Sequence, residues 1–362
     1  MNEGLDAQSL QTRPPTSDEL ITVVIPAKNE ESFIGPCLDS VLAQDEPNLQ
    51  VLVVDGASTD GTSQIVDEYM ERDPRVELLH NPDSIIPTSL NLALEAARGR
   101  WLVRVDAHAS IPSSYVRRVV AYLRTGEWGG VGGRKDGVGV TPAGRAIAVA
   151  MGSRFGVGNS TYHHGTRPQL VEHIPFGAYP TTLVRELGGW DERCVVNQDF
   201  EFDFRLRKNG HRLLFDPALA IDWHCRQSIP DLFRQYRRYG RGKALVSRLH
   251  PESIRPRHLA APALVAYLAG AGALALRRPG LAIASVSPYL VGLAAASAAA
   301  APKLDDRSSR PWLPAAFAAM HLGWGIGFWE GLIGMLRPRS RGAGRFSRSR
   351  PGTSGRVQQH LG

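Results

Sequence analysis

The sequence predicts an α/β domain built on a mostly parallel, doubly wound sheet, followed by an all-α region that associates with a membrane. Short apolar runs alternate with segments of helix length in the first half, and several of the runs end in an acidic residue at a turn. This alternation is typical of a parallel sheet covered by helices. Three long segments near the C-terminus carry almost no charge, which predicts the membrane region.

Composition narrows the classes of partner. The chain has 362 residues, is 43% hydrophobic and carries a formal net charge of +7. Its positive residues cluster late, between Arg226 and Arg257 and again after Arg337, where they bracket apolar segments. This placement favours an anionic membrane surface over nucleic acid. The three cysteines are odd in number and far apart, so they indicate a reducing compartment and predict no disulfide framework or zinc motif.

The first half is expected to alternate strands and helices in order. Residues 1–19 are polar and are expected to form a disordered leader. Acidic residues at the start of the first helix suit its positive dipole end, Asp60 is a good N-cap for the second, and Pro87 suits the first turn of the third. The expected strands are Ile21–Pro26, Leu49–Asp55, Val76–His80 and Trp101–Asp106. The expected helices are Glu30–Gln44, Thr62–Arg72, Pro87–Ala97 and Pro112–Leu123.

The pattern loosens between Gly129 and Gly177, where glycine is dense. We expect a loop-rich region there, of the kind that often binds a second substrate beside a rigid sheet. Regular pattern returns at Phe176–Trp190. The elements expected after it are a helix at Phe200–Lys208, a strand at Arg212–Asp216 and a helix rich in arginine and aromatic residues at Ile229–Leu249.

Three apolar segments follow, at 259–276, 280–301 and 312–336, each roughly as long as the ~20 residues that a bilayer span needs. We expect two to three of them to be membrane helices, with a buried soluble bundle as the alternative. If the preceding domain is cytoplasmic, three spans would place the basic tail 337–362, which is expected to be disordered, outside the cell. That conflicts with the positive-inside tendency, so one segment is expected to lie in the interface or re-enter, unless the tail is an exception. Pro288 and Glu330 mark the second and third segments as the candidates.

Two metal-capable side chains, Asp106 and His108, follow the strand that begins at Trp101. Open α/β sheets bind ligands beyond the carboxyl ends of their strands, so this pair is expected at the lip of a cleft. Where the chain turns, both can face one divalent cation, which would hold the diphosphate of a sugar nucleotide. The nitrogen ligand shifts preference from Mg²⁺ toward Mn²⁺. An ordinary strand-end aspartate and a solvated histidine are the alternative.

Other candidates end neighbouring elements. Asp55 ends the second strand at the same edge, where it would accept the donors of a nucleotide base or ribose, or simply form a turn. Asp199, at or just before the start of a helix, would act as a general base or cap that helix. His224 follows the last strand and would join the metal or diphosphate, or be structural. Glu201 and Asp203 are expected on the helix surface or paired with its arginines.

The basic helix contains Gln235, Arg238 and Tyr239. The arginines of this helix can hold diphosphate oxygens. Another face of the same helix can lie at an anionic membrane leaflet. Three motifs are absent from the sequence: the P-loop, a Gly-X-Gly-X-X-Gly turn after the first strand, and the Gly-X-Ser-X-Gly elbow. A P-loop nucleotidase, a dinucleotide oxidoreductase and an α/β-hydrolase are therefore unsupported.

Together these motifs resemble a known family, glycosyltransferase family 2. The resemblance covers about Ile21 to Lys243, and it implies a GT-A fold and inverting transfer from a nucleotide sugar, usually a UDP-sugar. The segment from His321 to Leu332 resembles the membrane tail of the succinoglycan branch of that family. The segments that carry the family resemblance are Val24–Glu30, Val53–Thr62, Val105–His108, Gln198–Asp199 and Gln235–Tyr239.

The resemblance also implies roles for individual residues in donor binding. Asp55 would bind the nucleotide base, with Pro26 and Glu30 lining its pocket. Asp106 and His108 stand where the family's Asp-X-Asp motif holds Mn²⁺ or Mg²⁺. His108 replaces the second aspartate of that motif, which bears on the identity of the metal.

In the later half, Asp199 would be the catalytic base, and Gln235, Arg238 and Tyr239 would match the family's Gln-X-X-Arg-Trp motif. His224 is a further candidate metal ligand from its position alone. Gln198 replaces the usual glutamate before the base. Tyr239 replaces tryptophan, which favours addition of a single sugar over processive synthesis.

The sequence therefore predicts a GT-A domain at 20–225, a basic interfacial region at 226–258 and membrane helices within 259–336. The expected protein is an inverting glycosyltransferase of the cell (inner or plasma) membrane whose catalytic domain faces the cytoplasm. It would use a lipid-linked saccharide acceptor in exopolysaccharide or cell-envelope glycan synthesis. One alternative is a polyprenyl-phosphate glycosyltransferase, whose ionised acceptor needs no general base. Another is a non-catalytic nucleotide-binding membrane scaffold.

Overall fold

The computed structural model describes residues 19–336, so the predicted leader up to residue 18 and the predicted tail lie outside the described range. Glu19 is described, and its carboxylate accepts hydrogen bonds from Trp101 Nε1 and Arg124 Nε, both at 3.0 Å. The strands are β1 (Ile21–Ala27), β2 (Leu49–Asp55), β3 (Val76–His80), β4 (Trp101–Arg104), β5 (Ala109–Ser110), β6 (Gly130–Val138), β7 (Gln169–Val171), β8 (Ala178–Pro180) and β9 (Leu213–His224).

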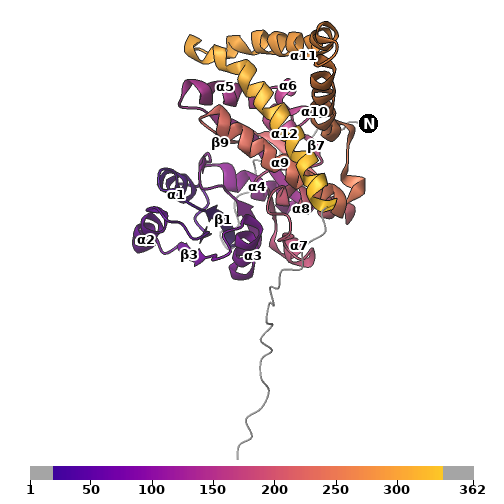
Figure 1. The fold of residues 1–362 in the computed structure, drawn as a ribbon. Helices are drawn as coiled ribbons and strands as arrows, with labels where there is room; N and C mark the ends of the chain where they lie inside the picture. Colours follow the sequence, from indigo (N-terminus) through magenta and orange to yellow (C-terminus); the bar gives the residue numbers. More distant parts are fainter. Residues whose placement is uncertain (1–18, 337–362) are drawn as a thin grey trace, which may run out of the picture.

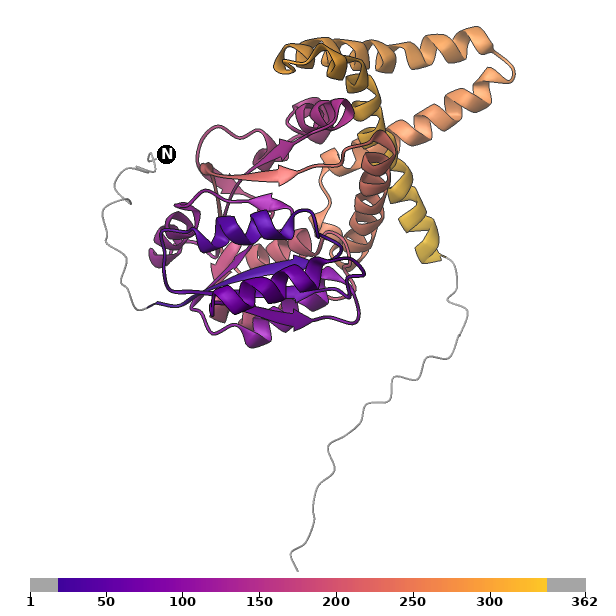
Figure 2. The same ribbon diagram turned by 90° about the vertical axis from the view of Figure 1, so that its left-hand side faces the viewer.

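Helices cover both faces of this sheet (Figures 1 and 2). Every residue of β2 is buried, as expected for a strand covered on both sides. The helices of the sheet domain are α1 (Ile34–Leu42), α2 (Thr62–Arg72), α3 (Ile86–Ala96), α4 (Tyr115–Arg124), α5 (Pro142–Met151), α6 (Arg154–Val157), α7 (Thr181–Glu186) and α8 (Gln198–Lys208). The C-terminal helices are α9 (Ile229–Leu249), α10 (Pro256–Ala275), α11 (Pro279–Ala300) and α12 (Leu313–Leu336).

The strand order is β3-β2-β1-β4-β8-β6-β9-β5, with β7 also paired to β9. The first four strands are parallel to one another, and this confirms the predicted α/β fold in the half built from alternating elements. The second half is mixed: β8 is antiparallel to β4 and β6, whereas β6 and β9 are parallel. The carboxyl ends of β1, β2 and β4 therefore meet at one edge.

The prediction of a loop-rich region between Gly129 and Gly177 is wrong, because this stretch contains β6, α5, α6 and β7. The glycines that hide the strand pattern are needed by the strand itself. A Cβ atom at Gly133 would lie 1.6 Å from the Leu219 carbonyl oxygen, and one at Gly130 would lie 2.7 Å from the Tyr179 ring. Neighbouring backbone and rings approach β6 too closely for side chains.

The first helix begins at Ile34 rather than at the predicted Glu30, and its first turn contains no acidic residue. Glu30 instead belongs to the loop after β1, where its backbone N–H donates to Thr62 Oγ1 at 2.8 Å. Its carbonyl oxygen accepts the backbone N–H of Ile34 at 2.8 Å, so Glu30 immediately precedes the helix, and its carboxylate contacts His108 Nδ1 at 2.8 Å.

The last apolar segment, α12, packs along α9 (Figure 1). Glycines allow the two helices to approach closely. Added Cβ atoms at Gly323, Gly327 and Gly331 would meet α9 at 2.8, 1.9 and 2.7 Å, and one at Gly240 on α9 would lie 2.1 Å from the Trp324 carbonyl oxygen. Small residues at four-residue spacing place a flat stripe on one face of α12, as in close helix pairs.

A charged cluster closes the same seam. Arg237 and Arg241 of α9 both donate to the Glu330 carboxylate of α12, with Nε–O distances of 2.8 and 2.7 Å. The two arginines lower the pKa of Glu330, chiefly through the Arg237 hydrogen bond. The acidic residue that marked this segment as unusual for a membrane span is therefore an ion-pair partner of the basic helix.

Two of the three predicted apolar segments, α10 and α11, are long and apolar enough to cross a membrane and are largely uncovered by the rest of the protein. They form a hairpin that projects from the body (Figure 2), joined near its middle by a 2.7 Å hydrogen bond from Tyr267 Oη to the Ser285 carbonyl oxygen. In the chain, this hairpin is inserted between α9 and α12.

We expect Gly327→Ala to destabilise the protein by about 1–3 kcal/mol, because overpacking at a tight contact forces backbone to move. The matched control is Gly334→Ala on the same helix, where an added Cβ meets nothing within 4 Å. That change should be neutral or stabilising by up to ~1 kcal/mol through helix propensity. Thermal unfolding of both variants in one detergent measures the difference, and equal midpoints would contradict the close seam.

Candidate active site

The edge formed by the ends of β1 and β2 holds the first group of predicted residues. Pro26 and Ala27 of β1 lie opposite Val54 and Asp55 of β2 in the parallel ladder. The Asp55 side chain is buried, and its carboxylate accepts the Ser58 backbone N–H at 3.2 Å. The turn-forming role considered for Asp55 is therefore realised, at a position next to Pro26.

The loops after β1 and β2 are tied together. Asn29 Oδ1 accepts the Thr59 backbone N–H at 2.8 Å, and the Asn29 backbone N–H donates to Ser58 Oγ at 2.9 Å. Asn29 and Ala57 both have positive φ, at 54° and 56°. Non-glycine residues in this region are concentrated at turns and ligand sites, and here they hold two loops of the candidate nucleotide pocket in one arrangement.

Arg104, the last residue of β4, joins two predicted site residues. Its Nη2 donates to Asp106 Oδ1 at 2.9 Å, and its Nη1 donates to Asp199 Oδ1. Only 4% of the Arg104 side chain is exposed. Asp106 and Asp199, which lie far apart in the sequence, are therefore both within reach of one guanidinium group.

The electrostatics of this cluster depend on both carboxylates. Burial by itself would lower the pKa of Arg104, but the charges of Asp199 and Asp106 raise it above its ordinary value. The guanidinium carbon also lies 5.4 Å from the centroid of the Phe176 ring. Phe176 has a φ of 53°, a strained value for an aromatic residue, so the surrounding fold holds it in place.

His108 is held by Glu30 rather than left solvated. Because a carboxylate only accepts, the 2.8 Å contact to Glu30 Oε1 places the proton on His108 Nδ1 and leaves Nε2 as the lone-pair atom of the neutral ring. Metal-binding histidines in proteins are commonly oriented by a carboxylate in this way. His224 reaches the same place through its backbone, whose N–H donates to the His108 carbonyl oxygen at 3.0 Å.

Within residues 19–336, no three His, Cys, Asp or Glu side chains converge as a complete metal site. The predicted set of Asp106, His108 and His224 is thus not assembled as three ligands. Asp106 and His108 alone present one carboxylate and one oriented imidazole, which is a donor set that suits a divalent ion with positions left for substrate oxygens. The chemistry of these two side chains therefore fits a divalent metal.

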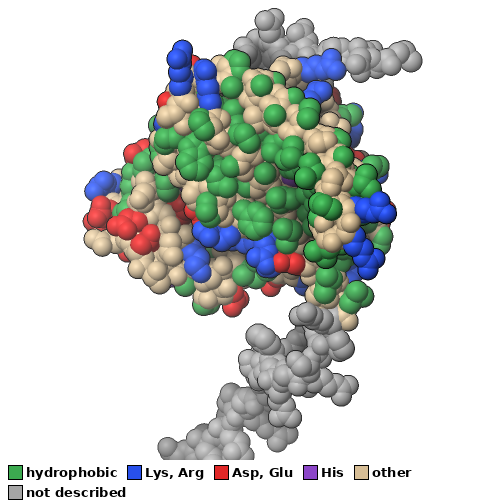
Figure 3. All heavy atoms as spheres, turned by 45° about the horizontal axis from the view of Figure 1, so that its top comes forward, with side chains coloured by type: hydrophobic (Ala, Val, Ile, Leu, Met, Phe, Trp, Pro, Cys, Tyr) green, Lys and Arg blue, Asp and Glu red, His purple; other side chains and the backbone are tan. Residues whose placement is uncertain are grey.

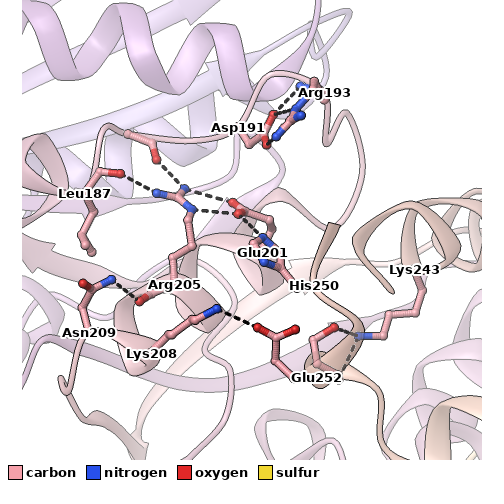
Figure 4. Close-up of polar contacts among 12 residues, drawn as sticks. Leu187, Asp191, Arg193, Glu201, Arg205, Lys208, Asn209, Lys243, His250 and Glu252 are labelled. Carbon is pink, nitrogen blue, oxygen red and sulfur yellow. Dashed lines mark hydrogen bonds and ion pairs between the residues drawn. The ribbon is translucent and has the colours of Figure 1, made fainter. Parts of the chain in front are cut away.

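Asp199 lies in the first turn of α8, as predicted, after Asn197 in the left-handed conformation. Helix α8 is anchored through Arg205 (Figure 4), which pairs with Glu201 at 2.7 Å and donates to the carbonyl oxygens of Leu187 and Gly189. His250, after α9, also contacts Glu201, at 2.9 Å. The helix that carries Asp199 is therefore fixed to two neighbouring segments.

The arginine pairing expected for Glu201 is confirmed, because Arg205 is its partner, whereas neither Glu201 nor Asp203 lies on the helix surface and Asp203 pairs with a histidine. Both are buried, Glu201 against Arg205 and Asp203 against His173, whose Nδ1 lies 2.7 Å from Asp203 Oδ2. Burial raises the pKa of Asp203 above its ordinary value. Tyr179 Oη also donates to this carboxylate, at 3.0 Å. The inner face of α8 is thus a polar layer that supports the site.

The predicted residues of α9 divide between two environments. Gln235 is buried, and its Nε2 donates to Tyr239 Oη at 3.1 Å, while Asn197 Nδ2 donates to the Tyr239 carbonyl oxygen at 3.0 Å. Tyr239 therefore lies beside the loop that precedes Asp199. Arg238 is exposed.

Two residues of the site were not predicted from the sequence. Arg104 lies in the stretch that drew attention to Asp106, and a charged residue in an otherwise apolar strand was the available signal. Lys135 lies on β6, in the region predicted to be loops. Its Nζ is 3.4 Å from the centroid of the Trp223 ring, and burial lowers its pKa to about 8.

The α/β sheet, with Asp55 at the end of β2 and Asp106 after β4 at one carboxyl edge, has the architecture of the GT-A class of glycosyltransferases. A model of the family "Glycosyl transferase family 2" matches residues 22–185. The succinoglycan biosynthesis protein ExoA of Rhizobium meliloti (strain 1021) is 33% identical over 338 residues, which cover 89% of this chain and 99% of that protein. The chain belongs to glycosyltransferase family 2 and is a glycosyltransferase.

Other similarities agree with this assignment. A dolichyl N-acetyl-α-D-glucosaminyl phosphate 3-β-D-2,3-diacetamido-2,3-dideoxy-β-D-glucuronosyltransferase of Methanococcus voltae is 25% identical over 63% of this chain and 74% of that protein. A mannosyltransferase of Pyrobaculum calidifontis, solved with GDP-Man and Mn²⁺, superposes with a TM-score of 0.60 over 90% of this chain and 92% of that chain, at 22% identity. The fold is therefore that of GT-A enzymes.

Removing the Arg104 charge tests how much its pairing with Asp106 and Asp199 contributes to stability. We expect Arg104→Met to lower stability by roughly 3–5 kcal/mol, because two partly buried carboxylates lose their shared partner. Adding Asp199→Asn to that variant should recover part of this loss while leaving the enzyme inactive. Denaturant unfolding together with a transfer assay checks both statements, and a stable Arg104→Met protein would contradict them.

Proposed function

We propose that this protein is a membrane-associated inverting glycosyltransferase that moves one sugar from a nucleotide sugar, expected to be a UDP-sugar, to a lipid-linked saccharide. The observation that carries the proposal is the Arg104 bridge. It brings the candidate metal carboxylate, Asp106, and the candidate base, Asp199, to one guanidinium. Leaving group and nucleophile must meet across a single anomeric carbon, and this arrangement supplies one carboxylate for each side.

The donor would lie along the carboxyl edge of the sheet. Asp55 ends β2, and Asp106 follows β4, with β1 between them. Adjacent strands are ~4.8 Å apart, so two spacings separate the two positions by about 10 Å, roughly the reach from a nucleoside to its diphosphate. Asp55, Pro26 and Glu30 would then bind or line the base and ribose, and the exposed Arg238 would approach the phosphates.

Asp106 and His108 would hold a divalent ion, Mn²⁺ or Mg²⁺. When bound, such an ion neutralises charge on the departing diphosphate. Glu30 orients the His108 ring for this purpose through Nδ1. The Mn²⁺ in the mannosyltransferase of similar fold supports a divalent cofactor here.

Asp199 would take the proton from the acceptor hydroxyl. Arg104 engages its Oδ1, which leaves Oδ2 as the oxygen available to the acceptor. Gln235 and Tyr239, joined at 3.1 Å beside the loop before Asp199, would line the acceptor side. The ionised hydroxyl would attack the anomeric carbon from the face opposite the diphosphate, so one displacement inverts the configuration.

The acceptor is proposed to be lipid-linked because the C-terminal helices offer a surface for a bilayer. Figure 3 shows hydrophobic side chains covering the face over these helices, with lysines and arginines around its margin. At 1.5 Å per residue, the 20 residues of α10 extend about 30 Å, the thickness of a hydrocarbon core. The relatives from Rhizobium meliloti and Methanococcus voltae, named for succinoglycan synthesis and for a dolichyl phosphate-linked acceptor, support this choice.

The hairpin also suggests how the protein is oriented. A pair of spans returns the chain to its starting side, so α12 can pack on α9 while both lie beside the catalytic domain. Basic residues are more numerous at the base of the hairpin than at its turn, which favours a cytoplasmic base and a plasma-membrane location. They are Arg255 and Arg257 at the start of α10 and Lys303, Arg307 and Arg310 after α11, against Arg277 and Arg278 at the turn.

The donor is identified by nucleotide release from detergent-purified protein offered UDP-, GDP- and dTDP-sugars together with membrane lipid extract. We expect release from one donor with Mn²⁺, and loss of release with EDTA or in Asp106→Asn. Nucleotide release that persists with EDTA would contradict the proposed metal dependence. Nucleotide binding without release, even when candidate lipid-linked sugars are added, would favour a non-catalytic scaffold.

Replacing the proposed base tests the chemistry of the acceptor. Asp199→Asn should keep donor affinity, because the amide oxygen still accepts from Arg104, and should lower the transfer rate by about 10²–10⁴-fold. The control is Asp191→Asn, a carboxylate with the same 17% side-chain exposure as Asp199, whose partner is the exposed Arg193. Full transfer by Asp199→Asn would show that Asp199 is not the general base. It would favour a phosphate acceptor, which is already ionised.

A further inference from the structure

β6 places a lysine among the site residues without giving it a partner. Lys135 Nζ lies 3.4 Å from the centroid of Trp223 and 4.9 Å from that of Phe176. The charges of Asp106 and Asp199 act on it, yet both carboxylates pair with Arg104 instead. Across the described residues, Lys135 itself enters no ion pair, although β6 holds it in a partly buried position.

The surroundings of Lys135 are built by local irregularities. The β6–β9 register shifts between Gly133 and Lys135, so that these residues face Asp216 and Ile221 on β9. Such bulges redirect a side chain next to an active site. Phe176, held at a φ of 53°, lies beneath both Lys135 and Arg104. The fold thus maintains strain at the residue that contacts both cations.

The strand order places Lys135 beyond Asp106, on the side away from Asp55. Across the sheet the strands follow the order β2-β1-β4-β8-β6. The strand that bears Lys135 therefore lies four interstrand spacings from the strand that bears Asp55. Four spacings of ~4.8 Å amount to about 19 Å, so Lys135 is remote from the proposed nucleoside and lies beyond Asp106.

The chemistry of the group points to an anion. Aromatic faces stabilise an ammonium without neutralising its charge, so the N–H donors that point away from the two rings remain available to phosphate oxygens. Arg104, by contrast, is already engaged by two carboxylates. We propose that Lys135 binds the phosphate that joins the acceptor to its lipid. This assignment rests on the proposed function and adds a headgroup site to it.

The test measures binding of farnesyl phosphate, farnesyl diphosphate, farnesol and inorganic phosphate to the purified full chain. Lys135→Met removes the charge at similar length, and Lys135→Arg keeps it. The control is Lys208→Met, an exposed lysine paired with Glu252 at 2.8 Å. We expect Lys135→Met to bind one or both farnesyl phosphates at least about tenfold more weakly than the wild type, with Lys135→Arg close to the wild type. Comparison of the mono- and diphosphate identifies which headgroup the site takes.

Other outcomes overturn the assignment. Unchanged affinity of Lys135→Met for both farnesyl phosphates would exclude Lys135 from headgroup binding. An equal loss of UDP or GDP affinity with Mn²⁺ would make Lys135 a ligand of the donor instead. Inorganic phosphate that binds as tightly as farnesyl phosphate would reduce the site to a general anion pocket. These are binding measurements, so absence of sugar transfer by the wild type, which would refute the proposed function, remains a separate result.

Discussion

A buried guanidinium needs compensating charge, and the rest of the structure depends on how Arg104 obtains it. Its two partners come from different parts of the chain: Asp106 is two residues away, whereas Asp199 is 95 residues away at the start of α8. An unpaired cation at this depth would cost several kcal/mol, so docking of α8 against β4 and neutralisation of Arg104 are one event. The same contact that stabilises the domain also sets the relative positions of the two carboxylates with proposed catalytic roles.

The restraint extends outward from this contact through successive ion pairs. Glu201 and Arg205 tie α8 to the carbonyl oxygens of Leu187 and Gly189, and His250 links Glu201 to the end of α9. Helix α9 is in turn fixed to α12 by the glycine seam and by Glu330. The last apolar helix therefore supports the helix that carries Gln235 and Tyr239, and the α10–α11 hairpin is the part that offers an uncovered apolar surface to a bilayer.

Backbone irregularity occurs at both ends of the proposed site. Asn29 and Ala57 hold the loops of the nucleotide end at positive φ, and Phe176 does the same between Arg104 and Lys135. Glycines in β6 let neighbouring segments of the protein approach closely and leave room for the bulge that directs Lys135. Strain of this kind persists only where the surrounding fold over-determines it, and this supports one continuous site running from the donor end to the acceptor end.

The sequence by itself determined the local features: the alternation of elements up to α4, the common edge of Asp55 and Asp106, and the position of Asp199 in the first turn of α8. Periodicity and turn chemistry encode these because each depends on residues close in the chain. Tertiary structure alone decided that β6 is a strand, that Arg104 bridges two carboxylates, and that α12 packs on α9. A glycine-rich strand has no side-chain pattern that would reveal it. An apolar helix face does not specify which helix will cover it, and a buried charge does not specify which residue will neutralise it. Both partners are decided only when the chain folds.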